Sequence, residues 1–114
     1  MPQNLEIIIS PTAVWSLQEI ESYKIRYIGA PQAAIFVDDM LSTTVSAVTQ
    51  NPSLYRFNVE LSDMGVQVRE KLLHDGQYRA LYTFDGQSIE VLLIISTKMD
   101  LINACYRYSM LPSS

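Results

Sequence analysis

Basic side chains in the second half of the chain have the clearest potential for chemistry. Arg69 and Lys71 alternate along one predicted strand, so their side chains share a face of the sheet. Arg79 belongs to the next strand, Lys98 follows the last one, and tyrosines lie nearby in sequence, namely Tyr78, Tyr82, Tyr106 and Tyr108. Basic groups interleaved with tyrosines on neighbouring strands can hold phosphates and stack bases. The pattern is therefore a candidate polyanion-binding surface.

The same basic groups also have a purely structural explanation. Each can be an ordinary solvated charge paired with a carboxylate, and the acids close to them in sequence are Glu70, Asp75, Glu90 and Asp100. For Arg79 the partner would be an acid on a neighbouring strand, for example Glu90. Composition alone favours this explanation, because most surface charges do no more than this.

Other combinations that could support catalysis receive less support. Cys105 and His74, the one cysteine and the one histidine, could form a thiol nucleophile and its base, but Cys105 shares the helical phase of Leu101 and is expected to pack as a small hydrophobic residue. Asp38 and Asp39 point about 100° apart on a helix and are expected on its solvated face. One cysteine and one histidine cannot build a disulfide or a Cys–His zinc site, so we expect no metal and no cofactor.

Length and composition describe one globular domain. The chain has 114 residues, 48% of them hydrophobic and 18% charged, so it can bury a core and is predicted to form a single domain over residues 1–114. No apolar run approaches the roughly 18–20 residues of a membrane-spanning helix. No basic residue precedes the short apolar stretch near the N-terminus, so that stretch does not resemble a secretory signal. We therefore expect a cytoplasmic protein that makes no membrane contact.

The charge of the chain is uneven. The net charge is −4, from 8 basic and 12 acidic residues. Residues 1–65 carry all of this excess negative charge, because residues 66–114 hold five basic and five acidic groups. Proteins that bind nucleic acid without specificity are usually basic, so any surface that faces a polyanion must lie in the second half.

The first half of the chain predicts a strand followed by two helices. Residues 5–9 are mostly β-branched and apolar, as in a buried strand. Ser10 and Pro11 then form a helix start, and apolar spacing continues the helix to residue 28. Gly29 ends it, and a second helix is predicted over 31–50. Such a short link requires the two helices to pack antiparallel, as an αα-hairpin.

The second half predicts three strands. Residues 52–65 have weak periodicity and are predicted to be an irregular connection with a short extended piece at 57–61. Strands follow at 66–73, 78–84 and 88–96, and an Asp-Gly pair marks the turn between the last two. A short C-terminal helix is predicted from Leu101 onward. The predicted fold class is α+β, with an N-terminal strand, an αα-hairpin and a three-stranded antiparallel meander that carries helices on one face.

Three stretches of the chain resemble a known family. They are IESYKIRYIGAPQAAIFVDDM in the helical hairpin, SLYRF after the second helix, and VREKLLHDGQYRALYTFDGQSIEVLLIISTKMD across the meander. Gly76, Tyr78, Arg79 and Tyr82 form a G-x-Y-R-x-x-Y pattern in the last of these. In order and spacing, nearly the whole chain resembles the RelE/ParE superfamily of bacterial type II toxins, and it is closer to ParE-like members.

This resemblance implies a toxin that a cognate antitoxin keeps silent, with roles in plasmid stabilization and growth inhibition. The antitoxin is expected to wrap the toxin beside the helical hairpin and the sheet, and operator DNA is expected to be bound only through the antitoxin. Because the toxin is acidic, we expect an antitoxin segment with more Lys and Arg than usual. Within the superfamily, RelE-like members cut mRNA on the ribosome, whereas ParE-like members inhibit DNA gyrase.

The RelE-like machinery can be carried over by position only in part. Arg69, Lys71 and Arg79 match basic positions of that group, Lys98 stands for the basic residue after the last strand, and Tyr106 is a counterpart of its C-terminal tyrosine. However, Leu73 stands where another basic residue is expected. If the chain is not a nuclease, we expect Arg69, Arg79 and Lys98 to contact the target.

The long helices and the acidic charge favour ParE-like gyrase inhibition, so the chain is expected not to be an enzyme. A RelE-like, ribosome-dependent mRNA endonuclease is the first alternative, with the ribosome and mRNA as partners. The second is a superfamily member that has lost toxicity and acts only as a binding partner.

Overall fold

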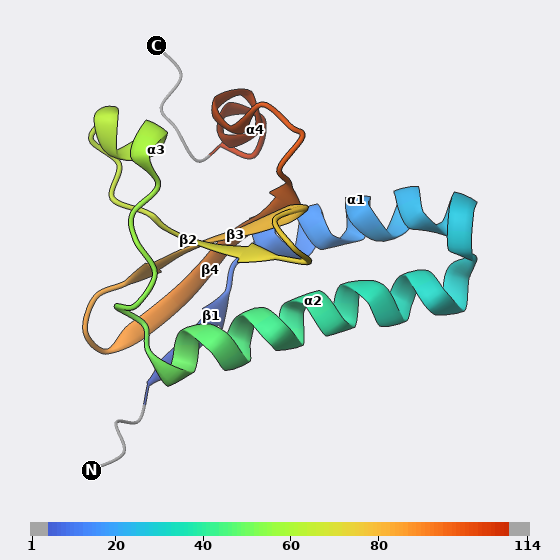
Figure 1. Ribbon diagram of the computed structural model, residues 1–114, viewed down its shortest axis with the longest axis horizontal. Coiled ribbons are helices and arrows are strands. Elements are labelled where there is room, and N and C mark those ends of the chain that lie inside the picture. The colour runs from blue at the N-terminus through green and yellow to red at the C-terminus, as the bar shows by residue number, and fades with distance from the viewer. Residues whose placement is uncertain (1–4, 110–114) are drawn as a thin grey trace.

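The computed structural model describes residues 5–109, and its chain begins with a strand and a long αα-hairpin (Figure 1). Strand β1 (Glu6–Ile9) leads directly into helix α1 (Pro11–Ile28). The Ser10 hydroxyl accepts a hydrogen bond from the Ala13 amide at 3.1 Å, which caps α1. Gly29 has φ +83°, a conformation that favours glycine, and α2 (Ala30–Gln50) starts immediately after it. The predicted hairpin is thus confirmed.

The connection after the hairpin differs from the prediction. Residues 57–61 do not form an extended piece, because helix α3 (Val59–Asp63) begins within them. The Asn58 side chain accepts a hydrogen bond from the Leu61 amide at 2.9 Å, so the backbone turns into a helix there. Phe57 alone makes a bridge, to Arg69. A single helical turn has too few apolar positions to show a period in sequence.

The meander and the C-terminal helix agree with the sequence prediction. Strands β2 (Arg69–Leu73), β3 (Tyr78–Phe84) and β4 (Ser88–Ser96) pair antiparallel, and helix α4 (Leu101–Arg107) follows. β2 is shorter than the predicted 66–73. β1 pairs parallel with β4, so the sheet has the order β1-β4-β3-β2.

Helices cover both faces of this sheet, so the prediction of helices on one face was wrong. α1 and α2 pack on one face, whereas α3 and α4 pack on the other (Figure 1). The first face holds alternate strand residues such as Ala80 and Tyr82, and the second holds Leu81, Leu93 and Ile95. Burial on both sides explains the continuous apolar run of β4.

The apolar side of α2 faces the sheet, and its solvated side is the one predicted from Asp38 and Asp39. Met40 and Val48 are fully buried in the first core, and Phe36 packs against its margin. Asp38 and Asp39 are exposed on the opposite side of the helix. The helical spacing therefore identified the buried side of α2 correctly.

The N-terminal part of α1 lies along β4 beyond the end of β1. The Ser10 and Thr12 hydroxyls donate to the Leu92 carbonyl at 3.1 and 2.6 Å, and the Ser16 hydroxyl accepts from the Ile94 amide at 3.1 Å. Side-chain oxygens thus satisfy main-chain groups of β4 that a neighbouring strand would otherwise pair. The last residues of β4 extend past this cover.

Candidate functional site

Arg79 lies on the second face of the sheet, where its guanidinium is paired with an acid. Its Nη1 donates to Glu70 Oε2 at 2.8 Å, and the two side chains are only 16% and 21% exposed. The same Glu70 oxygen accepts from Asn58 Nδ2 at 3.2 Å. The partner is on β2 rather than being Glu90 on β4, because Glu70 and Arg79 both point to the second face. Arg79 therefore takes part in an internal ion pair.

Arg69 and Lys71 lie on the first face of β2, opposite to Arg79. Arg69 pairs in register with Tyr82 and Lys71 with Ala80, and both of these belong to the first core. Arg69 Nη1 donates to the Tyr55 carbonyl at 2.7 Å, and its guanidinium lies 4.3 Å from the Phe57 ring centroid. Lys71 Nζ is 5.1 Å from the Tyr55 ring centroid. These contacts fasten the segment after α2 to the edge of the sheet.

Lys98 and Tyr106 lie apart from Arg69, Lys71 and Arg79. Lys98 is exposed in the turn after β4, and Tyr106 is 44% exposed on α4. The basic residues are therefore distributed over the two faces of the sheet and the turn after β4. It does not bring Arg69, Lys71, Arg79, Lys98 and Tyr106 together into one polyanion-binding surface.

Cys105 and His74 do not form a catalytic pair. Cys105 is fully buried in the second core, and this burial raises the pKa of its thiol. His74 is exposed in the β2–β3 turn and stacks on Phe36 of α2, with ring centroids 5.1 Å apart. Cys105 packs as a hydrophobic residue, as predicted.

Residues 5–109 contain neither a cluster of metal-ligating side chains nor a helix that could span a membrane. No group of three or more His, Cys, Asp or Glu residues within this range is arranged to hold a metal ion. Within the same range, no helix has the length and apolar character needed to cross a membrane.

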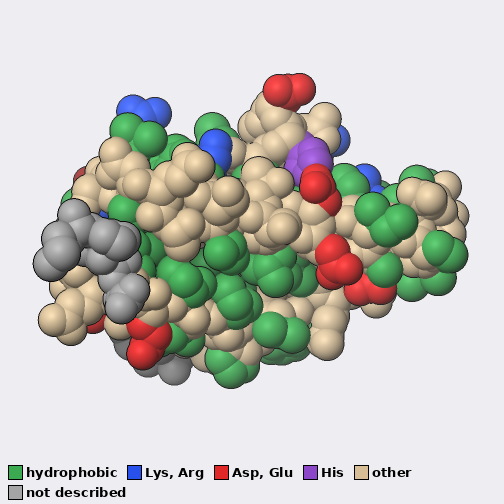
Figure 2. All heavy atoms as spheres, turned by 90° about the horizontal axis from the view of Figure 1, so that it is seen from below, with side chains coloured by type: hydrophobic (Ala, Val, Ile, Leu, Met, Phe, Trp, Pro, Cys, Tyr) green, Lys and Arg blue, Asp and Glu red, His purple; other side chains and the backbone are tan. Residues whose placement is uncertain are grey.

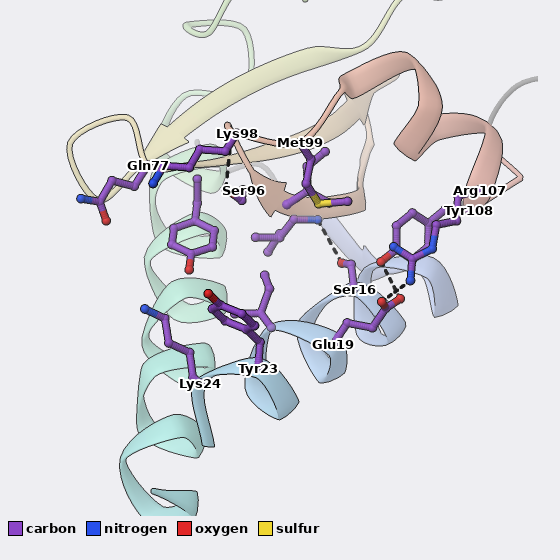
Figure 3. A pocket seen from close by; sticks show the side chains of 14 residues that line it. Ser16, Glu19, Tyr23, Lys24, Gln77, Ser96, Lys98, Met99, Arg107 and Tyr108 are labelled. Atoms are coloured by element: carbon purple, nitrogen blue, oxygen red, sulfur yellow. Dashed lines mark hydrogen bonds and ion pairs between the residues drawn. The ribbon is translucent and has the colours of Figure 1, made fainter. Parts of the chain in front are cut away.

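A cavity of about 520 Å³ opens between α1, the end of β4 and α4 (Figure 3). Its walls include Tyr23 and Lys24 from α1, Ser96 from β4, and Lys98 and Met99 from the turn that follows. Figure 3 shows that these side chains come from elements far apart in the sequence and converge on one opening. Charged, hydroxyl and apolar side chains therefore meet in this cavity.

Glu19 joins the two helices that border this cavity. Tyr108 donates from its hydroxyl to Glu19 Oε1 at 2.7 Å, and Arg107 Nη2 donates to Glu19 Oε2 (Figure 3). Trp15 packs edge-on against Tyr108 with ring centroids 5.1 Å apart. Burial, with a further contribution from the bond to Glu19, raises the pKa of Tyr108 to about 12. These contacts hold α4 against α1 at the border of the cavity.

Apolar side chains also gather at the free end of the αα-hairpin, which extends beyond the sheet (Figures 1 and 2). Tyr23, Tyr27 and Ile35 are 58%, 67% and 59% exposed, and Ile25 and Ile28 are also exposed. Exposed clusters of this kind are typical of surfaces that meet another protein.

Comparison with protein families decides between the two branches of the superfamily. Residues 7–101 match the model of the ParE toxin of the type II toxin–antitoxin system parDE. The chain belongs to the ParE toxin family. The resemblance to ParE-like members seen in the sequence is therefore confirmed.

Structural comparison supports the same fold. The ParE-family chain is similar to a chain of the chromosomal ParDE toxin–antitoxin system from P. aeruginosa, with a TM-score of 0.68 and 20% sequence identity. The match covers 83% of this chain and 98% of that one. No curated protein sequence matches the chain significantly. At this identity the likeness establishes the fold alone.

Sequence reasoning missed several residues that border the cavity of this ParE-family chain. Glu19 and Tyr23, like Ile20 and Lys24, are four positions apart on α1, so the two pairs form adjacent stripes on one side of the helix. This spacing is visible in the sequence, but nothing local to α1 shows that these side chains border a cavity. The contacts of Arg107 with Glu19 were not predictable, because they join residues 88 positions apart.

Proposed function

We propose that this ParE-family chain is the toxin of a type II toxin–antitoxin pair, that a cognate antitoxin neutralises it in the cytoplasm, and that it arrests growth by inhibiting DNA gyrase. Membership of the ParE family supports the toxin role. Gyrase inhibition rests on the expected behaviour of ParE-like members. Binding of operator DNA only through the antitoxin stays a prediction.

The placement of the basic residues is the observation that favours gyrase inhibition over RNA cleavage. A nuclease stabilises the charge that develops on the phosphate with cationic side chains that are preorganised to face it. Arg79 pairs with Glu70 on one face, whereas Arg69 contacts main-chain carbonyls on the other. Neither guanidinium is free to approach a shared phosphate without giving up these partners.

Of the three predicted target contacts, Lys98 has the exposed side chain, whereas Arg69 and Arg79 are partly buried. We therefore assign the larger role in target binding to Lys98. The exposed apolar end of the hairpin offers a second contact area for a protein target. This combination fits a protein partner better than a nucleic acid.

Two assays on the purified chain test the proposed function. In the first, supercoiling by DNA gyrase is measured with increasing toxin, and we expect inhibition that the product of the adjacent reading frame reverses. In the second, mRNA is followed in a translation reaction that contains ribosomes, and we expect it to stay intact.

Cleavage of mRNA only in the presence of ribosomes would reject gyrase inhibition in favour of a RelE-like nuclease. Expression that neither slows growth nor affects gyrase or mRNA would instead favour the non-toxic binding partner. Absence of a complex with the adjacent gene product at micromolar concentration would remove the toxin–antitoxin assignment.

A further inference from the structure

The outer side of α2 carries a shallow groove that no other element within residues 5–109 borders. Five side chains line it, and all of them come from α2, namely Asp38, Leu41, Ser42, Val45 and Ser46. Met40 and Val48, which are buried in the first core, point to the other side of the helix. Leu41 and Val45 supply apolar surface, and both remain partly exposed. The hairpin therefore leaves an apolar strip of α2 without a partner among the described residues.

The spacing of side chains on this side of α2 suits a second helix. Ile35, Asp38, Ser42 and Val45 follow one another at intervals of three, four and three residues, so they form one line along the helix. Ile35 at the start of this line is 59% exposed. Side chains at such intervals form the ridges and grooves into which another helix packs. An extended segment fits less well, because the main-chain groups inside a helix are already paired and offer it no hydrogen bonds.

The charge beside the groove is negative. Asp38, which lines the groove, and Asp39 are the only charged residues of α2, and within residues 5–109 neither forms an ion pair. The C-terminal end of α2 adds partial negative charge, since its last turn contains no basic residue. Figure 2 views the molecule from below, the side on which α2 lies in Figure 1, and hydrophobic and acidic side chains gather there, while Lys and Arg appear only near its margin. A partner that carries Lys or Arg meets a favourable field at this groove.

The same charge disfavours two other occupants. A second copy of the chain that packed through its own α2 would bring further carboxylates and no cation, so the acids would be buried without a counter-charge. Nucleic acid would bring phosphates, which Asp38 repels. A protein helix with both apolar and basic residues is the occupant that matches the groove in shape and in charge.

We propose that the groove of α2 holds a basic, amphipathic helix of the target, DNA gyrase, with apolar residues on Leu41 and Val45 and a Lys or Arg at Asp38. The inference rests on the proposed function, to which it adds a second target contact besides Lys98. It also gives the acidic first half of the chain a role in recognition, because the negative charge then selects a basic partner.

The first test measures inhibition of gyrase supercoiling by variants inside the groove. Asp38→Lys reverses the charge that faces the partner, and Ser42→Arg places a long cationic side chain in the groove. Ser42 is exposed, so the larger side chain does not disturb the core. We expect each variant to require about ten times more toxin than wild type for the same inhibition.

Neighbouring residues outside the groove provide matched controls. Asp39 and Thr43 are also exposed, but they do not line the groove, because consecutive helical residues point about 100° apart. Asp39→Lys and Thr43→Arg should each change inhibition by no more than about twofold, since isolated surface charges contribute little. Thermal melting checks that all four variants are folded.

The second test identifies the occupant by photo-crosslinking. A thiol-linked photoreactive group is attached to the Ser42→Cys variant, whose other cysteine, Cys105, is buried. Mass spectrometry of the complex with gyrase should find a crosslinked gyrase segment with Lys or Arg beside apolar residues at intervals of three and four. The same group on Thr43→Cys should crosslink much less. Replacing the basic gyrase residue by Glu should restore inhibition by Asp38→Lys.

Three results would overturn the inference while leaving gyrase inhibition intact. In the first, Asp38→Lys and Ser42→Arg inhibit gyrase as strongly as wild type. In the second, the group on Ser42→Cys crosslinks a second copy of the chain or the antitoxin instead of gyrase. In the third, the crosslinked gyrase segment is acidic or extended. Failure of the wild-type chain to inhibit gyrase would instead reject the proposed function, and the inference with it.

Discussion

Removing either partner of the Arg79–Glu70 ion pair should destabilise the fold, and by unequal amounts. Arg79→Ala leaves Glu70 with its hydrogen bond from Asn58, whereas Glu70→Ala leaves a guanidinium with no acid beside it. A buried cation without a partner is costly, because it has lost both water and its counter-charge. We therefore expect Glu70→Ala to be the more harmful change.

The exposure of the two side chains determines how much unfolding free energy is lost when the ion pair is broken. Exposed ion pairs contribute about 0–1 kcal/mol, and breaking a buried pair costs about 3–5 kcal/mol. With side chains 16% and 21% exposed, this pair lies between those limits. We expect Arg79→Ala to lower the free energy of unfolding by about 2 kcal/mol and Glu70→Ala by about 3 kcal/mol. For a chain of this size these losses correspond to about 8 °C and 12 °C in Tm.

The assay is a double-mutant cycle read by urea denaturation, with gyrase inhibition measured on the same proteins well below their Tm. The double variant should lose less than the sum of the single losses, with a coupling of about 1–2 kcal/mol. If the chain inhibits gyrase as proposed, the inhibition by Arg79→Ala should persist wherever the variant is folded. The reasoning would be refuted by additive losses, or by Arg79→Ala that melts like wild type yet no longer inhibits gyrase, because Arg79 would then serve the target and not the fold.

Further predictions concern buried groups. Tyr82 and Tyr108 have pKa values raised to about 12. The free energy of unfolding should therefore be full below pH 10 and fall from pH 10 to 12, by up to about 3 kcal/mol per tyrosine. Denaturation at pH 9 and pH 11 checks this fall, and replacing either residue by Phe should reduce it. Cys105 should react with a thiol reagent only as fast as the chain unfolds, which comparison of the labelling and unfolding rates measures. Met40→Ala should lower the free energy of unfolding by about 2–5 kcal/mol, whereas exposed Ser42→Ala on the same helix should change it by less than about 0.5 kcal/mol, both by urea denaturation.

Local signals in the sequence predicted most of the fold. Ser10-Pro11 and Gly29 set the ends of α1, and the Asp-Gly pair between β3 and β4 placed the hairpin turn. α3 was missed because its start depends on one side-chain hydrogen bond from the Leu61 amide to Asn58. The sequence also did not predict that helices cover both faces of the sheet, since α3 and α4 are too short to reveal which face they pack on.

The candidate site was less predictable, because it depends on register. Alternation along β2 correctly placed Arg69 and Lys71 on one face. The partner of Arg79 depends on how β2 pairs with β3, where Leu72 lies opposite Arg79 and Glu70 opposite Leu81. A strand displaced by one residue would exchange the two faces, and no short-range signal sets that displacement. The cavity depends in addition on how α4 docks on α1.

The position of β1 has a consequence for how this protein is made. The strand is translated before the other described elements, yet it pairs with β4, and Ser10 bonds to Leu92, a residue 82 positions later. Contacts that span such a distance form late, because the chain between them must be ordered first. The αα-hairpin can therefore form during synthesis, whereas the sheet closes only after β4 has been translated. A toxin that folds in this order should stay harmless as a nascent chain. The antitoxin therefore has the whole time of translation in which to become available before the toxin is fully folded.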